Sequence, residues 1–338
     1  MTKEPSIASP AKFSTSRICL RDCVLLAALV AIAGASLFTP RLTYAQQAEH
    51  AAQPEATESA DKAATRPTKT KLNHDRFLRI RKDERDRSMA LETSIVRYEK
   101  VTEDNTRITV DLIGAVHVGH AEYYEQLNQQ FEKYEVLLYE LVAPEGTVIP
   151  KGGRDPGESG VPTSPVAALQ MGMKSVLELD FQLELIDYTK DNFVHADMSP
   201  EEYGESMEEN DESIAGYALK GIGQGMALQA AGKGGGEIGM LMALFSKNKA
   251  VRLRRSMAKQ MVDMGAGMIM FEGKNGSTII DHRNAKCMSV LKEQIDSGKR
   301  NLAIFYGAGH LADMDQRLLN EFGMKRGGTR WLTAWKLR

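Results

Sequence analysis

The chain has 338 residues, and its 43 lysines and arginines against 45 acidic residues give a formal net charge of -2. This length is enough for one domain of roughly 250 residues with its own core, plus appendages. The charge balance favours no charged partner, and the sequence has no basic face with interleaved aromatic residues, so we expect no nucleic-acid binding.

The N-terminal segment, residues 1–45, has the pattern of a signal peptide. Basic residues precede an uncharged apolar run, Val24–Phe38, and the small residue Ala45 fits a signal peptidase site. The run is short for a membrane span, so we expect export to the periplasm or the extracellular space, with an uncleaved membrane anchor as the alternative. Cleavage would leave Cys287 as the one remaining cysteine, which excludes an intramolecular disulfide.

The next segment, residues 46–75, is rich in Ala, Gln, Glu, Thr and Pro and has almost no large apolar side chain. Such a segment cannot offset its ordering entropy, so we expect a disordered linker. An α/β domain is then expected over residues 76–338. Its first strands, Phe77–Ile80 and Leu91–Tyr98, predict that the sheet opens with an antiparallel meander.

The first chemically informative stretch reads as strand, turn, helix, strand. A β-branched run that begins at Ile108 leads to Gly114 and His117, and a segment of helical period follows. A second apolar run, Val136–Val142, contains Glu140. A helix between two strands favours parallel strands, which place ligand sites beyond their carboxyl ends. His117 stands at such an end.

The middle of the chain, residues 143–276, is predicted to be a mostly helical insertion or cap. It opens with a loop rich in glycine and proline, residues 143–164, which is expected to border the site. Helices are predicted at Leu177–Tyr188 and after Ser199, where Ser-Pro-Glu-Glu has helix-start chemistry. Thr278–Ile295 predicts a further helix.

The C-terminal segment repeats the earlier pattern. The strand Leu302–Tyr306 meets Gly307–His310, a helix is expected over Leu311–Phe322, Gly327-Gly328 suggests a turn, and Trp331–Leu337 a last strand. Gly-x-x-His therefore occurs twice between a strand and a helix. We interpret the two copies as halves of one site, in a central mixed sheet flanked by helices.

Four residues carry the predicted chemistry: His117, Glu140, Arg283 and His310. Two imidazoles and a carboxylate suit a divalent manganese, cobalt or zinc ion with an open position for water. His117 and His310 would hold the metal, and Glu140 would either ligate it as well or act as general base toward the bound water. Arg283 would hold Glu140 or stabilise an oxyanion. A purely structural role for each histidine is the alternative.

Further candidates have weaker support from the sequence. Asn284, His195 and Asp197 are secondary site residues, and His120 is expected to lie behind a ligand or to face solvent. Cys287 falls in the middle of a predicted helix, where a buried, inert thiol is expected.

The motifs resemble those of the TraB/PrgY/GumN family, which includes the Tiki metalloproteases. The resemblance is carried by Gly114–His117, the strand with Glu140, Arg283-Asn284 and Gly307–Leu311, and it extends over Ile108–Leu337. It implies an erythromycin esterase/ChaN-like fold, and the Tiki members imply metal-dependent peptide cleavage. Relatives often carry Glu-Arg where this chain has Asp281-His282, which leaves the partner of Arg283 open.

The sequence thus predicts an exported metal-dependent hydrolase that acts on a peptide or small-molecule substrate. A non-catalytic exported protein that sequesters a peptide or a haem-like ligand in the same cleft is the alternative.

Overall fold

The computed structural model describes residues 73–153, 174, 176–213, 216, 248–265 and 277–338. The predicted signal peptide, nearly all of the predicted linker and the second half of the loop 143–164 lie outside these ranges. Of the helices in the described ranges, none combines the length and the apolarity needed to span a membrane.

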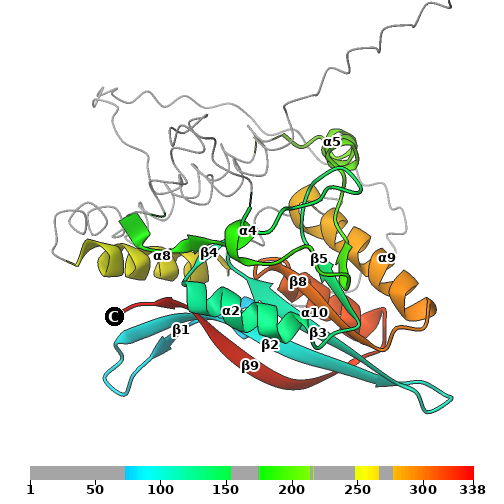
Figure 1. Ribbon diagram of the computed structural model, residues 1–338, viewed down its shortest axis with the longest axis horizontal. Coiled ribbons are helices and arrows are strands. Elements are labelled where there is room, and N and C mark those ends of the chain that lie inside the picture. The colour runs from blue at the N-terminus through cyan, green and yellow to red at the C-terminus, as the bar shows by residue number, and fades with distance from the viewer. Residues whose placement is uncertain (1–72, 154–173, 175, 214–215, 217–247, 266–276) are drawn as a thin grey trace, which may run out of the picture.

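A mixed sheet of seven strands forms the centre of the described structure (Figure 1). Its order is β1-β2-β3-β8-β5-β7, and β9 pairs with β2. Strands β3, β8, β5 and β7 run parallel to one another, whereas β2 is antiparallel to β1, β3 and β9. The predicted α/β class, the mixed sheet and the opening meander are therefore confirmed. The strands are β1 (Leu78–Lys82), β2 (Ser88–Val101), β3 (Arg107–Ala115), β5 (Val136–Tyr139), β7 (Phe193–His195), β8 (Asn301–Gly307) and β9 (Lys325–Lys336), and β4 (Val118–Gly119) pairs with β6 (Asp180–Phe181) in a separate ladder.

Helices cover both faces of the sheet because the central strands are apolar on both sides. In β8, Ala303 and Phe305 belong to one buried cluster, while Ile304 and Tyr306 belong to the other. The first cluster includes side chains of α2 and α8, and the second includes side chains of α9 and α10. The described helices are α2 (Ala121–Phe131), α4 (Gln182–Leu185), α5 (Pro200–Glu209), α8 (Lys249–Gly265), α9 (Arg283–Asp296) and α10 (Leu311–Asn320), with the 3-10 helix η1 (His74–Arg76) and the π-helix η3 (Thr278–His282).

Local sequence signals account for most of these helices. Tyr124, Leu127 and Phe131, which predicted the inner face of α2, are at most 1% exposed. Helix α5 begins as predicted, because the Ser199 hydroxyl accepts a hydrogen bond from the Glu202 backbone N–H and the Glu202 carboxylate accepts one from the Ser199 N–H.

The predicted helix Leu177–Tyr188 is confirmed only in part, at Gln182–Leu185. The segment forms β6 and the four-residue helix α4. Leu177 and Leu179 are both buried at a spacing of two, and the Gln182 N–H donates to the His117 carbonyl at 2.9 Å. The backbone of this segment therefore pairs with β4, and that pairing outweighs helix propensity.

The predicted turn at Gly327-Gly328 is wrong, because both glycines lie inside β9. The register runs from Val96 opposite Thr329 to Tyr98 opposite Arg326, so the two glycines face the single residue Arg97. This is a β-bulge, in which one strand carries an extra residue.

Two observations concern segments at or within the predicted domain divisions. Helix η1 contains His74 and Asp75, which are the last residues of the predicted linker, and His74 is 9% exposed. Strand β7 lies within the predicted helical insertion, yet it is an edge strand of the main sheet.

Candidate functional site

The site is built where three neighbouring parallel strands end. Ala115 at the end of β3 is opposite Gly307 at the end of β8, and Tyr139 at the end of β5 is opposite Phe305. His117 follows β3 after one intervening residue, and Glu140 follows β5 directly. The carboxyl ends of these strands therefore bring both predicted side chains to one edge of the sheet, as expected for a parallel arrangement.

Gly307 is the point on which the predicted metal-binding residues converge. A Cβ atom built on Gly307 would lie 3.2 Å from Glu140 Oε2, 3.7 Å from His310 Cδ2 and 4.0 Å from His117 Nε2. The Gly307 backbone N–H donates to Glu140 Oε2 at 2.6 Å. The structure thus brings His117, Glu140 and His310 together, and the absence of a side chain at position 307 leaves room for the carboxylate.

Arg283, at the start of α9, clamps two carboxylates. Its Nη2 donates to Glu140 Oε1 at 2.7 Å and to Asp197 Oδ2 at 2.5 Å, and its Nε donates to Asp197 Oδ1 at 2.9 Å. The exposed side-chain fractions are 6% for Arg283, 12% for Glu140 and 0% for Asp197. Of the two predicted roles for Arg283, this geometry supports the one in which it holds Glu140. We call Arg283, Asp197, Glu140 and His310 the Arg283 cluster.

The cluster stabilises its own charges. Burial alone raises the pKa of Glu140, but the charges of Arg283, His310 and His117 and the hydrogen bond from Gly307 together hold it below its usual range. Burial lowers the pKa of Arg283, and the facing carboxylates of Asp197 and Glu140 reverse this and raise it well above its usual value. The ion pair therefore stays charged at neutral pH.

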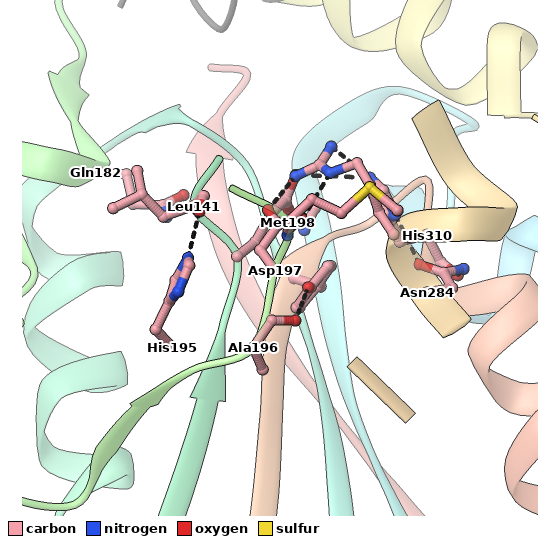
Figure 2. Close-up of polar contacts among 12 residues, drawn as sticks. Leu141, Gln182, His195, Ala196, Asp197, Met198, Asn284 and His310 are labelled. Carbon is pink, nitrogen blue, oxygen red and sulfur yellow. Dashed lines mark hydrogen bonds and ion pairs between the residues drawn. The ribbon is translucent and has the colours of Figure 1, made fainter. Parts of the chain in front are cut away.

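His310 is the buried histidine of the cluster. It stands at the N-cap of α10 and is 6% exposed. Its Nε2 lies 3.5 Å from Glu140 Oε1. Its Nδ1 lies 2.8 Å from Asn284 Oδ1 (Figure 2). Burial lowers its pKa to about 4 against the opposing charge of Glu140, so the imidazole is neutral at physiological pH.

The two Gly-x-x-His motifs are not equivalent in space. Gly114 is opposite Tyr306, one position before the Ala115–Gly307 pair. A Cβ on Gly114 would meet Leu311 Cδ1 at 3.4 Å, so the first glycine packs in the core and only the second lines the site. His117 is exposed and leads into β4, whereas His310 caps a helix.

Two candidate histidines lie apart from the cluster. Figure 2 shows His195 pointing toward Leu141 and away from His310, and its Nε2 lies 2.5 Å from the Leu141 carbonyl oxygen. His120 is the half-buried N-cap residue of α2, where its backbone N–H donates to the Ala334 carbonyl at 3.0 Å.

The donor atoms suit a divalent cation in kind, because imidazole nitrogen and carboxylate oxygen bind manganese, cobalt and zinc. Within the ranges that the structure describes, no three side chains of His, Cys, Asp or Glu are close enough together to hold a metal ion as they stand. His310 and Glu140 are adjacent, and the exposed His117 faces them across Gly307.

Asp197 has a larger part in the site than its prediction as a secondary site residue indicated. It forms two of the three hydrogen bonds that Arg283 makes to carboxylates, and it sits two residues beyond β7 at the same edge of the sheet. Recognition of β7 as a strand would have placed it there. Cys287 is 0% exposed, and burial raises the pKa of its thiol, as expected for an inert cysteine.

Fold and site together define an α/β protein with a buried arginine–carboxylate–histidine cluster at the carboxyl edge of parallel strands. The chain matches no family model, no curated protein and no solved structure with which it was compared.

Proposed function

We propose that this protein is an exported metal-dependent hydrolase that cleaves peptides, with an erythromycin esterase/ChaN-like arrangement of its sheet. The observation that carries the proposal is the convergence of His117, Glu140 and His310 around Gly307. The substrate class and the export come from the sequence, through the resemblance to the TraB/PrgY/GumN family and the signal-peptide pattern.

His310, Glu140 and His117 would hold the ion. A divalent cation supplies Lewis-acid polarisation of a carbonyl group and lowers the pKa of water. His310 suits the role of ligand because its imidazole is neutral. His117 is exposed, so rotation of its side chain would complete the set without disturbing the core.

Glu140 is better suited to bind the cation than to act as a general base. Its low pKa makes it a weak proton acceptor at neutral pH. Arg283 and the Gly307 N–H each engage one carboxylate oxygen, which fixes the orientation of the group and leaves a lone pair on each oxygen. Arg283 thus acts as a positioning residue for Glu140.

The test is cleavage of a mixture of unstructured peptides, followed by mass spectrometry. The full chain is stripped with chelator and reloaded with manganese, cobalt or zinc. We expect cleavage only after reloading, and a loss of about 100-fold or more in His310→Ala. The matched control His195→Gln changes a histidine that points away from the cluster and should retain activity. Tight binding of a peptide or haem without turnover would contradict the hydrolase and favour a sequestering protein.

A further inference from the structure

Asn284, on helix α9, has a fully buried side-chain amide that contacts both His310 and Asp313 of helix α10. Its Oδ1 lies 2.8 Å from His310 Nδ1. Its Nδ2 donates to the His310 carbonyl oxygen at 3.1 Å and to Asp313 Oδ2 at 2.8 Å. All three contacts lie within hydrogen-bond distance, and Asn284 is 0% exposed.

The two contacts of Nδ2 fix the orientation of the amide. A carbonyl oxygen and a carboxylate oxygen can only accept hydrogen bonds, so the amide nitrogen must face both of them. The opposite orientation would set Oδ1 against two acceptors in a buried site, which is costly. Asn284 Oδ1 therefore faces His310, and because this oxygen can only accept, His310 Nδ1 must carry the ring proton.

Asp313 is held in turn by Arg317, one helical turn further along α10. Arg317 Nε donates to Asp313 Oδ2 at 2.6 Å, the same oxygen that receives the Asn284 amide. The side chains of Arg317 and Asp313 are 20% and 19% exposed, so this end of the chain of contacts lies closer to the surface.

We propose that Asn284, Asp313 and Arg317 form a relay of positioning residues that fixes the buried His310 as its Nδ1–H tautomer. Nε2 then carries the lone pair, and it lies 3.5 Å from both Glu140 Oε1 and Arg283 Nη1. The ring thus presents an acceptor nitrogen, and no proton, to the site.

The consequence for metal binding rests on the proposed function. An imidazole ligates a metal ion through its unprotonated ring nitrogen. The hydrogen bond that the protonated ring nitrogen donates fixes the tautomer, and so determines which nitrogen is free to bind the metal. The relay makes Nε2 of His310 the ligand atom, on the side of the ring that faces Glu140.

The decisive measurement is a long-range proton–nitrogen correlation spectrum of the metal-free full chain with nitrogen-15-labelled histidine, at a pH of about 8, where imidazoles are neutral. Comparison with His310→Gln assigns the signal. We expect a protonated Nδ1 and an unprotonated Nε2 for His310. His195 is the internal reference, because the Leu141 carbonyl at 2.5 Å requires a protonated Nε2, the opposite tautomer. A protonated Nε2 on His310 would overturn the relay.

Two variants distinguish a role of Asn284 in fixing the tautomer of His310 from a role in packing alone. Asn284→Ala removes the acceptor, so we expect His310 to lose its single tautomer and metal affinity to fall about 10- to 100-fold. Asp313→Asn retains an acceptor oxygen for the amide and should keep the tautomer. An unchanged His310 signal in folded Asn284→Ala would refute the relay, and if that variant does not fold, the wild-type and Asp313→Asn spectra still decide.

The outcome is separable from that of the proposed function. A fixed Nδ1–H tautomer in a wild-type chain that binds no metal supports the relay and contradicts the hydrolase. Metal binding by a chain whose His310 has no fixed tautomer in the metal-free state contradicts the relay and supports the metal site of the proposed hydrolase.

Discussion

Arg283→Met should strongly destabilise the fold, because it leaves two carboxylates without their counter-ion. The substitution keeps much of the side-chain length and removes three charge-assisted hydrogen bonds. The side chain of Asp197 is 0% exposed. Of the described residues, Met198 would then remain as a hydrogen-bond donor to it, through its backbone N–H at 2.8 Å. Removal of one partner from a buried ion pair typically costs about 3–5 kcal/mol, and we expect that loss in the free energy of unfolding.

The assay is urea unfolding followed by circular dichroism at neutral pH. The double variant Arg283→Met, Asp197→Asn also removes the stranded charge, so its loss should be smaller than the sum of the two single losses by about 1–3 kcal/mol. Arg107→Met is the control, because Arg107 is 67% exposed and 3.8 Å from Glu99, and its loss should stay below about 1 kcal/mol. A loss below about 1 kcal/mol in Arg283→Met, or strict additivity in the double variant, would refute the account of the cluster.

Three further predictions concern single positions and are measured as free energies of unfolding. Gly307→Ala should cost about 1–3 kcal/mol, because the added methyl would lie 3.2 Å from the Glu140 carboxylate. The control Gly328→Ala, whose added methyl would have no atom within 4 Å, should change stability by less than about 0.5 kcal/mol. Equal effects of the two substitutions would contradict the crowding at position 307. Ser199→Ala should cost about 1 kcal/mol through loss of the capping box, and no loss would show that α5 does not depend on its cap. Burial lowers the pKa of His74, so the unfolded chain binds this proton at a higher pH than the folded chain does, and the folded state loses stability as the pH falls below about 6.5. His74→Leu should remove that part of the pH dependence, and parallel pH profiles for variant and wild type would contradict it.

The elements that periodicity specifies were predictable. The apolar face of α2 and the run of β8 follow from spacing alone, because each buries a regular set of side chains. The sequence placed Glu140 in the apolar run Val136–Val142, where a carboxylate is costly unless it is paired or stands at the strand's end. In the structure Glu140 both follows the end of β5 and pairs with Arg283.

Elements that depend on distant pairing were not predictable. The segment around β6 is rich in Leu, Glu and Gln, which favour a helix, and pairing with β4 makes Asp180–Phe181 extended. Gly327-Gly328 has turn composition, and only the register against Arg97 shows a bulge. Both errors arise because the propensity of a local segment carries no information about a hydrogen-bond partner elsewhere in the chain.

The site was predictable in its principal residues but not in its connections. His117, Glu140, Arg283 and His310 were identified from motif and order, and the structure brings them to one edge of the sheet. That Asp197 is the main partner of Arg283 could not be read from the sequence, because strand β7, which leads to Asp197, was not recognised.

The central claim is a divalent metal held by His117, Glu140 and His310. Metal content by mass spectrometry, on protein purified without chelator, tests it most directly, beside the double variant His117→Ala, His310→Ala. The account predicts about one ion per chain in the wild type and none in the folded variant. No metal in the wild type after addition of manganese, cobalt and zinc, or equal metal in both proteins, would contradict it.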